Sequence, residues 1–238
     1  MIRKQQIKLY LLLATLALVS AASGTEPSLA TPRGEIVLFD GQSLDSWTTA
    51  DGDPITKGWQ VEKGELVRTE RGGAIYAENP WENFELEFEW KIAKGGNSGV
   101  KYRVQFYEKG VRGRPGWLGC EYQLYDDAKL KTGRSAGSTA ALYSLYPPND
   151  KKKLNAPGQY NHSRIVVRGN RIEHWLNGER VVQADTGSDD WQARVAGSKF
   201  ANVERFAQNR KGRIQIQDHG SKVWFRKILL RPLEAGGL

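Results

Sequence analysis

Cysteine and methionine are almost absent from this chain of 238 residues, which has one of each, Cys120 and Met1. A single cysteine excludes an intramolecular disulfide, and the lack of a cysteine cluster excludes a structural zinc site built on cysteine. The core must therefore be built from aromatic and branched aliphatic side chains. Hydrophobic residues make up 39% and charged residues 26% of the chain, which excludes a disordered, collagen-like or coiled-coil protein.

Long apolar runs are missing after the first 22 residues. Three basic residues among the first eight precede an apolar run over 9–19, and the small residues Ser20–Ser23 follow it. This pattern predicts a signal peptide over residues 1–22, followed by a polar, proline-containing linker over 23–34. An uncleaved membrane anchor is the weaker alternative, because spanning a bilayer takes about 20 apolar residues. We expect an exported protein, periplasmic or extracellular, with no stable membrane insertion after the signal is removed.

The positive charge of the chain is mostly dispersed. Residues 1–22 carry three positive charges and no negative one, so their removal lowers the formal net charge from +8 to about +5. The run Lys151–Lys153 follows a Pro-Pro-Asn-Asp turn and is typical of a solvated loop tip. No basic stripe or recognition motif is present, so we expect no nucleic-acid partner.

Helical periodicity is also scarce, and alternation with a period of two dominates. Residues 84–90 alternate apolar and acidic side chains without interruption, which predicts a half-buried strand. Further strands are predicted at 100–106, 121–126, 164–168, 172–176, 181–183, 213–217 and 223–230. Only 198–209 has helical spacing, through Phe200, Val203 and Phe206.

Turn residues separate these strands. Asn177-Gly178 and Gly169-Asn170 each join two predicted strands as hairpin turns, and Asp218–Ser221 is predicted to turn the last pair. Many short strands with frequent turns and almost no helix predict an all-β fold, an antiparallel sandwich or jelly roll. No internal repeat or second domain is apparent.

Motifs throughout the chain resemble one known family. They are Leu38-Phe39-Asp40-Gly41, Gly58-Trp59, Gly64-Glu65-Leu66, Phe84-Glu85-Leu86, Gly96-Asn97-Ser98-Gly99-Val100, Glu121-Tyr122-Gln123-Leu124, Asp126-Asp127, Ala141-Leu142-Tyr143, His174-Trp175-Leu176-Asn177-Gly178, Ile216-Gln217-Asp218-His219-Gly220 and Phe225-Arg226-Lys227-Ile228. They span residues 37–232 in order and resemble the 3-keto-disaccharide hydrolase family, long catalogued as a domain of unknown function. The sequence departs from the family at two places. At Gln159-Tyr160-Asn161 the family more often has an acidic residue and Trp before the Asn. At Lys227 the closing strand of the family usually has Asn.

The resemblance implies a jelly-roll sandwich of the concanavalin A-like lectin/glucanase type over residues 35–233, which agrees with the period-two pattern. It also implies action on sugars oxidised at C3, because family members are described as hydrolases or lyases of 3-keto-glycosides. The glycoside and linkage are not specified by it.

A 3-keto sugar allows cleavage without the paired carboxylates of an ordinary glycosidase. The ketone acidifies the C2 proton, so a base can form an enolate that expels the C1 oxygen. This route needs a base near neutral pH, donors or a metal at the enolate oxygen, and an acid for the leaving group. Glu85, Glu87 and Glu89 share one sheet face, but a plain solvated face explains them better than catalysis.

A better constellation lies on three other strands, where polar residues alternate with apolar ones. The expected catalytic residues are His219, Glu121 and His174, and the expected substrate-binding residues are Asn97, Lys101, Arg103, Gln123, Asp126, Tyr143 and Gln217. Amide and guanidinium groups can satisfy vicinal sugar hydroxyls with paired hydrogen bonds. The face is either a solvated surface or a concave sugar site, and the strands must lie in one sheet for a single site.

Several of these residues have structural alternatives. His219 precedes a turn glycine and could be an exposed loop histidine, whereas His174 shares the parity of apolar neighbours and could be a satisfied core histidine. Asn97 could occupy a left-handed turn. Asp126 could cap a loop or bind a cation, and Tyr143 could pack as a buried aromatic rather than stack on a sugar.

The remaining single residues point to structural roles. Trp117 has the same alternatives as Tyr143, His162 is expected to be structural, and Cys120 is expected to be a buried free thiol. The sequence requires no cofactor. It leaves a divalent cation open, but no spacing such as His-x-x-x-His occurs, so any cation site would have to be assembled from distant strands.

The leading functional hypothesis is an exported enzyme that cleaves 3-keto-glycosides by C2 proton abstraction and elimination, with or without water addition. Its partner is then a small carbohydrate. The alternative is a noncatalytic carbohydrate-binding module on the same scaffold, which would bind sugar without turnover. A structural or adhesion module would show neither tight sugar binding nor acid–base residues in a cleft.

Overall fold

A computed structural model describes residues 34–234 of the chain. These residues lie within one unit, residues 32–238. The predicted signal peptide, 1–22, and all but the last residue of the predicted linker, 23–34, lie outside the described residues.

The strand with the clearest alternation forms as predicted. β6, Phe84–Ile92, buries every second residue, because its apolar side chains face the interior and its polar ones face outward. On the outward face, Glu85 pairs with Arg231, with Nη1 to Oε1 at 2.8 Å, and Glu87 pairs with His162, with Nε2 to Oε2 at 3.2 Å. Glu89 pairs with Arg226. The three glutamates are therefore part of an ion-paired outer surface, and His162 shares it.

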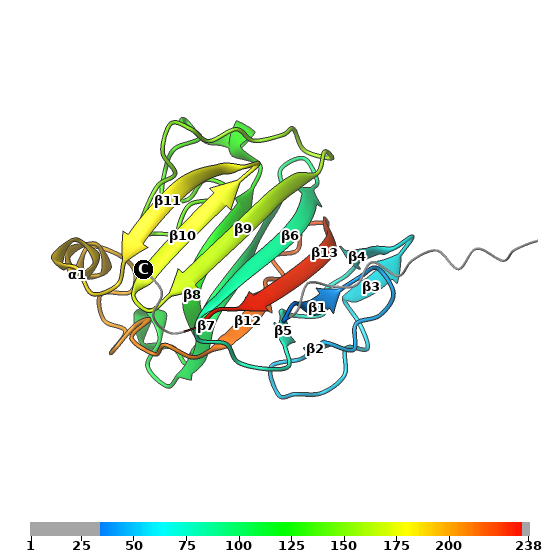
Figure 1. The fold of residues 1–238 in the computed structure, drawn as a ribbon, viewed down its shortest axis with the longest axis horizontal. Helices are drawn as coiled ribbons and strands as arrows, with labels where there is room; N and C mark the ends of the chain where they lie inside the picture. Colours follow the sequence, from blue (N-terminus) through cyan, green and yellow to red (C-terminus); the bar gives the residue numbers. More distant parts are fainter. Residues whose placement is uncertain (1–33, 235–238) are drawn as a thin grey trace, which may run out of the picture. The chain divides into compact units, whose positions relative to one another are not determined.

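All strand pairs are antiparallel, and they form two sheets. The eight-stranded sheet has the order β11 (Glu179–Asp185), β10 (Arg171–Leu176), β9 (Asn161–Arg168), β6, β13 (Val223–Pro232), β4 (Glu65–Arg68) and β3 (Trp59–Glu62), with β1 (Ile36–Phe39) also on β13. The five-stranded sheet has the order β2 (Trp47–Thr48), β5 (Ile75–Ala77), β12 (Arg213–Ile216), β7 (Asn97–Tyr107) and β8 (Gly116–Tyr125). Figure 1 shows β11, β10, β9, β6 and β13 side by side in that order.

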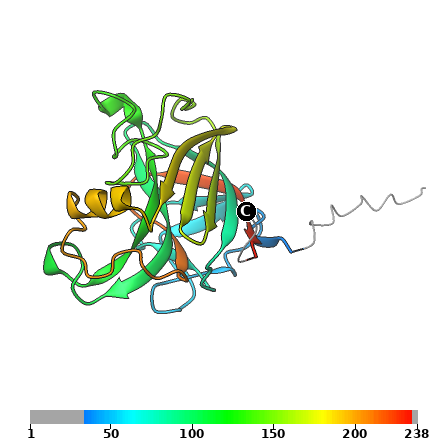
Figure 2. The ribbon, with the colours of Figure 1, turned by 60° about the vertical axis from the view of Figure 1, so that its left-hand side comes forward.

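The two sheets pack face to face and enclose an aromatic core. In Figure 2, the green strands β7 and β8 lie in a different layer from the olive strands of the larger sheet. Between the layers, Phe84 meets Tyr102 and Phe88 meets Tyr122, each edge to face, with ring centroids 6.2 and 5.7 Å apart. The all-β, antiparallel jelly-roll prediction is confirmed, and the core is built from the aromatic and aliphatic residues expected.

Two of the three predicted turns are hairpins, and the third is not. Asn177 and Gly178 have φ of 48° and 86° and join β10 to β11, and Gly169 with Asn170 joins β9 to β10. The segment Asp218–Ser221 instead leads from β12 in the smaller sheet to β13 in the larger one. Asp218 holds this crossing, because its carboxylate accepts hydrogen bonds from Arg68 Nε at 2.8 Å and from the backbone of Gly72 and Gly73 at 3.0 Å.

The helix prediction is wrong in position. The structure has one α-helix among the described residues, α1, Asp189–Ala196, and residues 198–209 form successive turns. Ser188 caps α1 by accepting from the Trp191 amide, and two aspartates follow in its first turn. Phe200 and Phe206 are buried and stack with ring centroids 3.9 Å apart. Their spacing in the sequence therefore reflects burial in a turn segment and does not indicate a helix. Two short 3₁₀ turns occupy Val111–Gly113 and Asp127–Lys129.

None of the helices found between residues 34 and 234 has the length and hydropathy needed to cross a membrane.

A β-bulge interrupts β7 at Arg103. The register with β8 shifts between Tyr102 and Gln105, and Arg103 takes a φ of 53°. A glycine on β8 and another just before β12 give the bulge room: a Cβ on Gly119 would lie 2.4 Å from the Tyr102 carbonyl oxygen, and one on Gly212 would lie 2.4 Å from the Arg103 carbonyl carbon. The bulge therefore depends on two residues that are distant from it in sequence.

We expect Gly119→Ala to lower the free energy of unfolding by about 1–3 kcal/mol. The added methyl group would overlap the Tyr102 carbonyl oxygen, and relieving that overlap requires the backbone of β7 to shift. Urea denaturation measures the change. Gly116→Ala is the matched control on the same strand, since a Cβ there meets nothing within 4 Å. Equal stability of the two variants would contradict this account of the bulge.

Candidate functional site

Three adjacent strands of the smaller sheet carry the polar residues that the sequence singles out. Gln215 on β12 pairs with Lys101 on β7, and Lys101 pairs with Glu121 on β8. One step along, Gly99 pairs with Gln123, and the Gln217 amide donates to the Gly99 carbonyl oxygen at 2.9 Å. These side chains point away from the core, and we call Lys101, Glu121, Gln123, Gln215 and Gln217 the polar face.

The polar face is not a solvated surface. Glu121, Gln123, Gln215 and Gln217 are only 6%, 4%, 3% and 7% exposed. A sheet face of charged and amide side chains is rarely buried to this extent unless it holds specific polar contacts. Of the two expectations for this face, the solvated one is therefore wrong.

Glu121 lies at the centre of this arrangement. Its Oε2 accepts a hydrogen bond from Gln217 Nε2 at 2.9 Å, and its backbone oxygen accepts from the Tyr143 amide at 2.9 Å. Burial raises the pKa of the Glu121 carboxyl above its usual 4.5, while the charges of Lys101 and Lys199 oppose that rise. The result is a carboxylate that is more basic than an ordinary glutamate.

Two lysines supply the positive charge beside Glu121. Burial lowers the pKa of Lys101 and of Lys199, and the negative charge of Glu121 opposes both shifts. The Lys199 Nζ atom lies over the Tyr143 ring, 4.1 Å from its centroid. Sequence reasoning missed Lys199, because it belongs to the turn segment 198–209, and no local pattern shows where that segment returns to the sheet.

His219 follows Asp218 in the crossing between the sheets, and the residue is exposed. The covered part of its ring, together with the charges of Lys101 and Lys199, lowers the pKa of His219 below its usual 6.5, and Asp218 opposes the shift. The imidazole is therefore neutral near pH 7. The same two lysines act on His219 and Glu121, which brings the two predicted catalytic groups into one electrostatic neighbourhood.

Three amide groups of the polar face have unused hydrogen-bonding capacity. The side-chain oxygens of Gln123, Gln215 and Gln217 are buried and have no partner, although Gln123 Nε2 donates to Asn97 Oδ1 at 3.3 Å. Asn97 itself begins β7 and does not occupy a left-handed turn. Buried acceptors without partners are costly, and donors such as sugar hydroxyls would satisfy them.

Gly99 lies directly beneath the contact between Gln217 and Glu121. A Cβ at this position would lie 2.6 Å from Gln217 Oε1 and 2.9 Å from Glu121 Oε1. The glycine of the Gly-Asn-Ser-Gly motif therefore lets the amide and the carboxylate lie close to the sheet.

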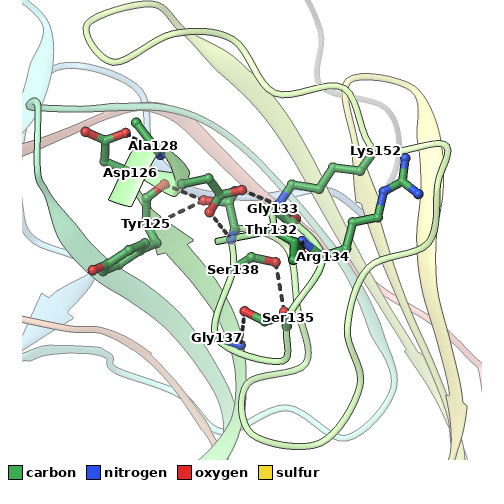
Figure 3. Close-up of polar contacts among 12 residues, drawn as sticks. Tyr125, Asp126, Ala128, Thr132, Gly133, Arg134, Ser135, Gly137, Ser138 and Lys152 are labelled. Carbon is green, nitrogen blue, oxygen red and sulfur yellow. Dashed lines mark hydrogen bonds and ion pairs between the residues drawn. The ribbon is translucent and has the colours of Figure 1, made fainter. Parts of the chain in front are cut away.

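Asp126 has a different role from the one predicted. Its Oδ1 accepts from the Ala128 amide at 3.1 Å and caps the turn that follows (Figure 3). Its Oδ2 accepts from the Gly95 amide at 2.6 Å. The neighbouring Asp127 pairs with Lys152, with Nζ to Oδ2 at 2.5 Å, and the Lys152 side chain is only 6% exposed. Of the alternatives left open for Asp126, the structure shows the cap. Lys152 is not part of a solvated loop tip.

Arg103 and His174 lie away from the polar face. The bulge turns Arg103 inward, where it is 1% exposed and donates to the Gly169 carbonyl oxygen. His174 is fully buried between the sheets, and its Nδ1 lies 3.1 Å from the Ala140 carbonyl oxygen and its Nε2 2.8 Å from the Tyr102 hydroxyl. Neither side chain joins the Glu121 neighbourhood. Of the residues expected to converge, Glu121 and Gln217 are in contact, His219 is acted on by the same two lysines as Glu121, and Arg103 does not join them. His174 is a satisfied core histidine.

Cys120 is buried, as expected, and burial raises the pKa of its thiol to about 12. Within residues 34–234, no three His, Cys, Asp or Glu side chains gather closely enough to hold a metal ion. The divalent cation left open by the sequence has no candidate ligand cluster in this part of the chain.

Comparisons with known proteins agree with the fold and its motifs. Residues 34–231 match the family described as a 3-keto-α-glucoside-1,2-lyase-like domain. The 3-keto-disaccharide hydrolase of Bacteroides thetaiotaomicron is 31% identical over an alignment 233 positions long, and the match covers 84% of this chain and 79% of that protein. The crystal structure of a candidate glycosyl hydrolase from Parabacteroides distasonis, at 32% identity, covers 84% of this chain and 95% of its own, with a TM-score of 0.73. A second from that organism, at 26% identity, covers 84% and 99%, with a TM-score of 0.61.

The buried His174 predicts a pH-dependent loss of stability. Burial lowers the pKa of His174 from 6.5 to about 4, whereas the unfolded chain protonates at the usual value. Stability from this residue is therefore complete above pH 6.5 and is lost as pH falls toward 4, by up to about 3 kcal/mol. Urea denaturation across this range should show the decline in the wild type and in His162→Asn, and a smaller decline in His174→Asn. The same slope in all three proteins would rule out the assignment.

Proposed function

Since this chain belongs to the family of 3-keto-α-glucoside-1,2-lyase-like domains, as its motifs predict, we propose that it cleaves 3-keto-glycosides, with 3-keto-disaccharides as the substrate class. The reaction is removal of the C2 proton and elimination of the C1 oxygen, with or without addition of water. The observation that carries this proposal is the buried Glu121 carboxylate, whose pKa is raised beside two lysines and a neutral histidine.

Glu121 is the base in this proposal. A general base works best when its pKa approaches the working pH, and burial shifts a carboxylate in that direction. Gln217 fixes the orientation of the carboxylate through the hydrogen bond to Oε2. Glu121 then takes the C2 proton of the substrate, and the electron pair of the C–H bond moves into the enolate formed with the C3 carbonyl.

Lys101 stabilises the enolate. Negative charge develops on the C3 oxygen as the proton leaves, and a positive group already in place lowers the energy of that state without reorganisation. Lys101 lies directly opposite Glu121 across the strand pair, so a sugar held over the polar face meets both groups. Lys199 adds a second positive charge from the turn segment.

His219 assists the leaving group. When the enolate collapses, a C1=C2 double bond forms, the C1–O bond breaks, and the departing oxygen needs a proton. His219 can relay this proton: one ring nitrogen donates its N–H to the departing oxygen while the other nitrogen takes a proton from water, so the imidazole stays neutral and hydroxide is left. For net hydrolysis, the hydroxide left by the water that reprotonates His219 adds to C1. Glu121 exchanges the abstracted proton with solvent and then delivers a solvent-derived proton to C2, so the atoms balance.

The amides of the polar face and Tyr143 bind the substrate in this proposal. Gln123 and Gln217 offer unpartnered oxygens to hydroxyl donors, and Asn97 lies beside Gln123. Tyr143, near Glu121, presents a ring that already carries Lys199 on one side. We also infer export, because the basic and apolar residues 1–22 have the pattern of a signal peptide.

Glu121→Gln and His219→Gln should each reduce kcat on a 3-keto-disaccharide by on the order of 10²–10⁴-fold, because each removes a proton-transfer group. Glu87→Gln and His162→Gln on the outer surface are matched controls and should retain activity. Chromatographic product assays measure the rates, and circular dichroism checks folding. Full activity in both site variants would reject the roles, and sugar binding without turnover by the wild type would favour the noncatalytic module.

Run in deuterated water, the same assay reports on the C–H bond. Elimination leaves no hydrogen on C2, and subsequent hydration places deuterium there. A product that retains the original hydrogen at C2 would contradict proton abstraction.

The pH profile tests Glu121 as the base. A carboxylate base is inactive when protonated, so kcat/KM should fall as pH drops through the raised pKa of Glu121, above the usual 4.5. Lys101→Met removes a charge that lowers this pKa, so the acid limb should move to higher pH, whatever the loss of kcat. Lys222→Met, at an exposed position just before β13, should leave the limb in place. An unmoved limb in Lys101→Met would exclude Glu121 as the titrating group.

A further inference from the structure

An aromatic row continues the polar face. Tyr76 on β5 pairs with Gln215, and its ring lies 5.6 Å from the Trp117 ring on β8. Trp117 in turn lies 5.5 Å from Phe106, its partner on β7. Phe106 is 46% exposed, and Trp117 is half-buried.

The row lies on the same side of the sheet as Glu121. Trp117 and Glu121 are four residues apart on β8, and side chains with even spacing on a strand share a face. Because the β7 bulge adds a residue opposite Gly119, Phe106 is brought into register with Trp117 rather than pointing to the other side. Without the bulge, Phe106 would share the parity of the core residue Tyr102.

Packing alone does not account for this row. The Gln215 oxygen is buried without a partner, although its Nε2 donates to the Tyr76 hydroxyl at 2.5 Å. Arg213 lies over the Tyr76 ring at 4.7 Å and is itself bound to backbone oxygens, so Tyr76 is held in place. Phe106 also lines a cavity of about 600 Å³ with polar residues of the 198–209 turns. The row thus combines a fixed ring at Tyr76, an unused acceptor at Gln215 and, at its Phe106 end, an adjoining cavity.

The distance to Glu121 indicates what the row could bind. Four residues of a strand span about 13 Å at roughly 3.4 Å each. The backbone positions of Glu121 and Trp117 are therefore farther apart than one sugar ring is wide, and a disaccharide is a ligand long enough to extend from one to the other. Sugar rings have an apolar C–H face that packs on aromatic rings, while their hydroxyls need acceptors such as the Gln215 oxygen.

We propose that Trp117, Phe106 and Gln215 form the subsite for the second sugar ring, the leaving group, of a 3-keto-disaccharide. This inference rests on the proposed function, because the oxidised ring must lie over Glu121 for the other ring to reach the row. The subsite determines preference for disaccharides over glycosides with small leaving groups.

Two substrates separate this subsite from the chemistry. Trp117→Ala and Phe106→Ala should lower kcat/KM for a 3-keto-disaccharide by on the order of tenfold and change that for methyl 3-keto-glucoside less than about twofold. Trp224→Ala, a half-buried tryptophan on β13 of the other sheet, is the matched control and should change neither. Because Phe106 is 46% exposed, its variant is expected to fold even if Trp117→Ala does not. Equal losses on both substrates, or no loss on either, would overturn the subsite.

Binding distinguishes failure of the subsite from failure of the proposed function. Calorimetry with the unoxidised disaccharide should show weaker binding to Phe106→Ala than to the wild type and to Glu87→Gln. If the wild type has no turnover but the disaccharide binds and Phe106→Ala weakens that binding, the subsite stands and the proposed chemistry fails. Binding that Phe106→Ala and Trp117→Ala leave unchanged would overturn the subsite even in an active enzyme.

Discussion

The pairing of Lys101 with Glu121 across β7 and β8 is the interaction on which the candidate site depends. It places opposite charges side by side on a face where the glutamate is only 6% exposed. A buried carboxylate without a partner would take up a proton, and a buried lysine without a partner would lose one. Each charge opposes the pKa shift that burial causes in the other, in a setting of low polarity where electrostatic forces on a bound sugar are stronger than in water.

The two sides of the smaller sheet treat polar groups in opposite ways. Toward the core, His174 has both ring nitrogens occupied, so it stabilises the interior and has no capacity left for a ligand. On the polar face, Gln123, Gln215 and Gln217 keep buried oxygens without partners. Unsatisfied acceptors reduce stability, and their gathering on one face is typical of a surface arranged for binding rather than for folding.

The bulge in β7 links the fold to the arrangement of the site. It turns Arg103 inward, which removes a cation from the polar face, and it brings Phe106 into line with Trp117. Gly119 on β8 and Gly212, just before β12, make it sterically possible. One extra residue in a strand therefore separates a charged region around Glu121 from an aromatic region farther along the sheet.

The sequence by itself determined the strands, because alternation such as that of residues 84–90 is a local pattern that any sheet preserves. It also determined the family and the parity that unites Glu121 with Gln123 on one strand and Gln215 with Gln217 along another. Only the tertiary structure decided that Arg103 leaves this set, that Asp218 crosses between sheets, and that Lys199 approaches Glu121. These outcomes depend on contacts between residues far apart in the chain, such as Gly119 with Tyr102 and Arg68 with Asp218, and a local pattern carries no information about them.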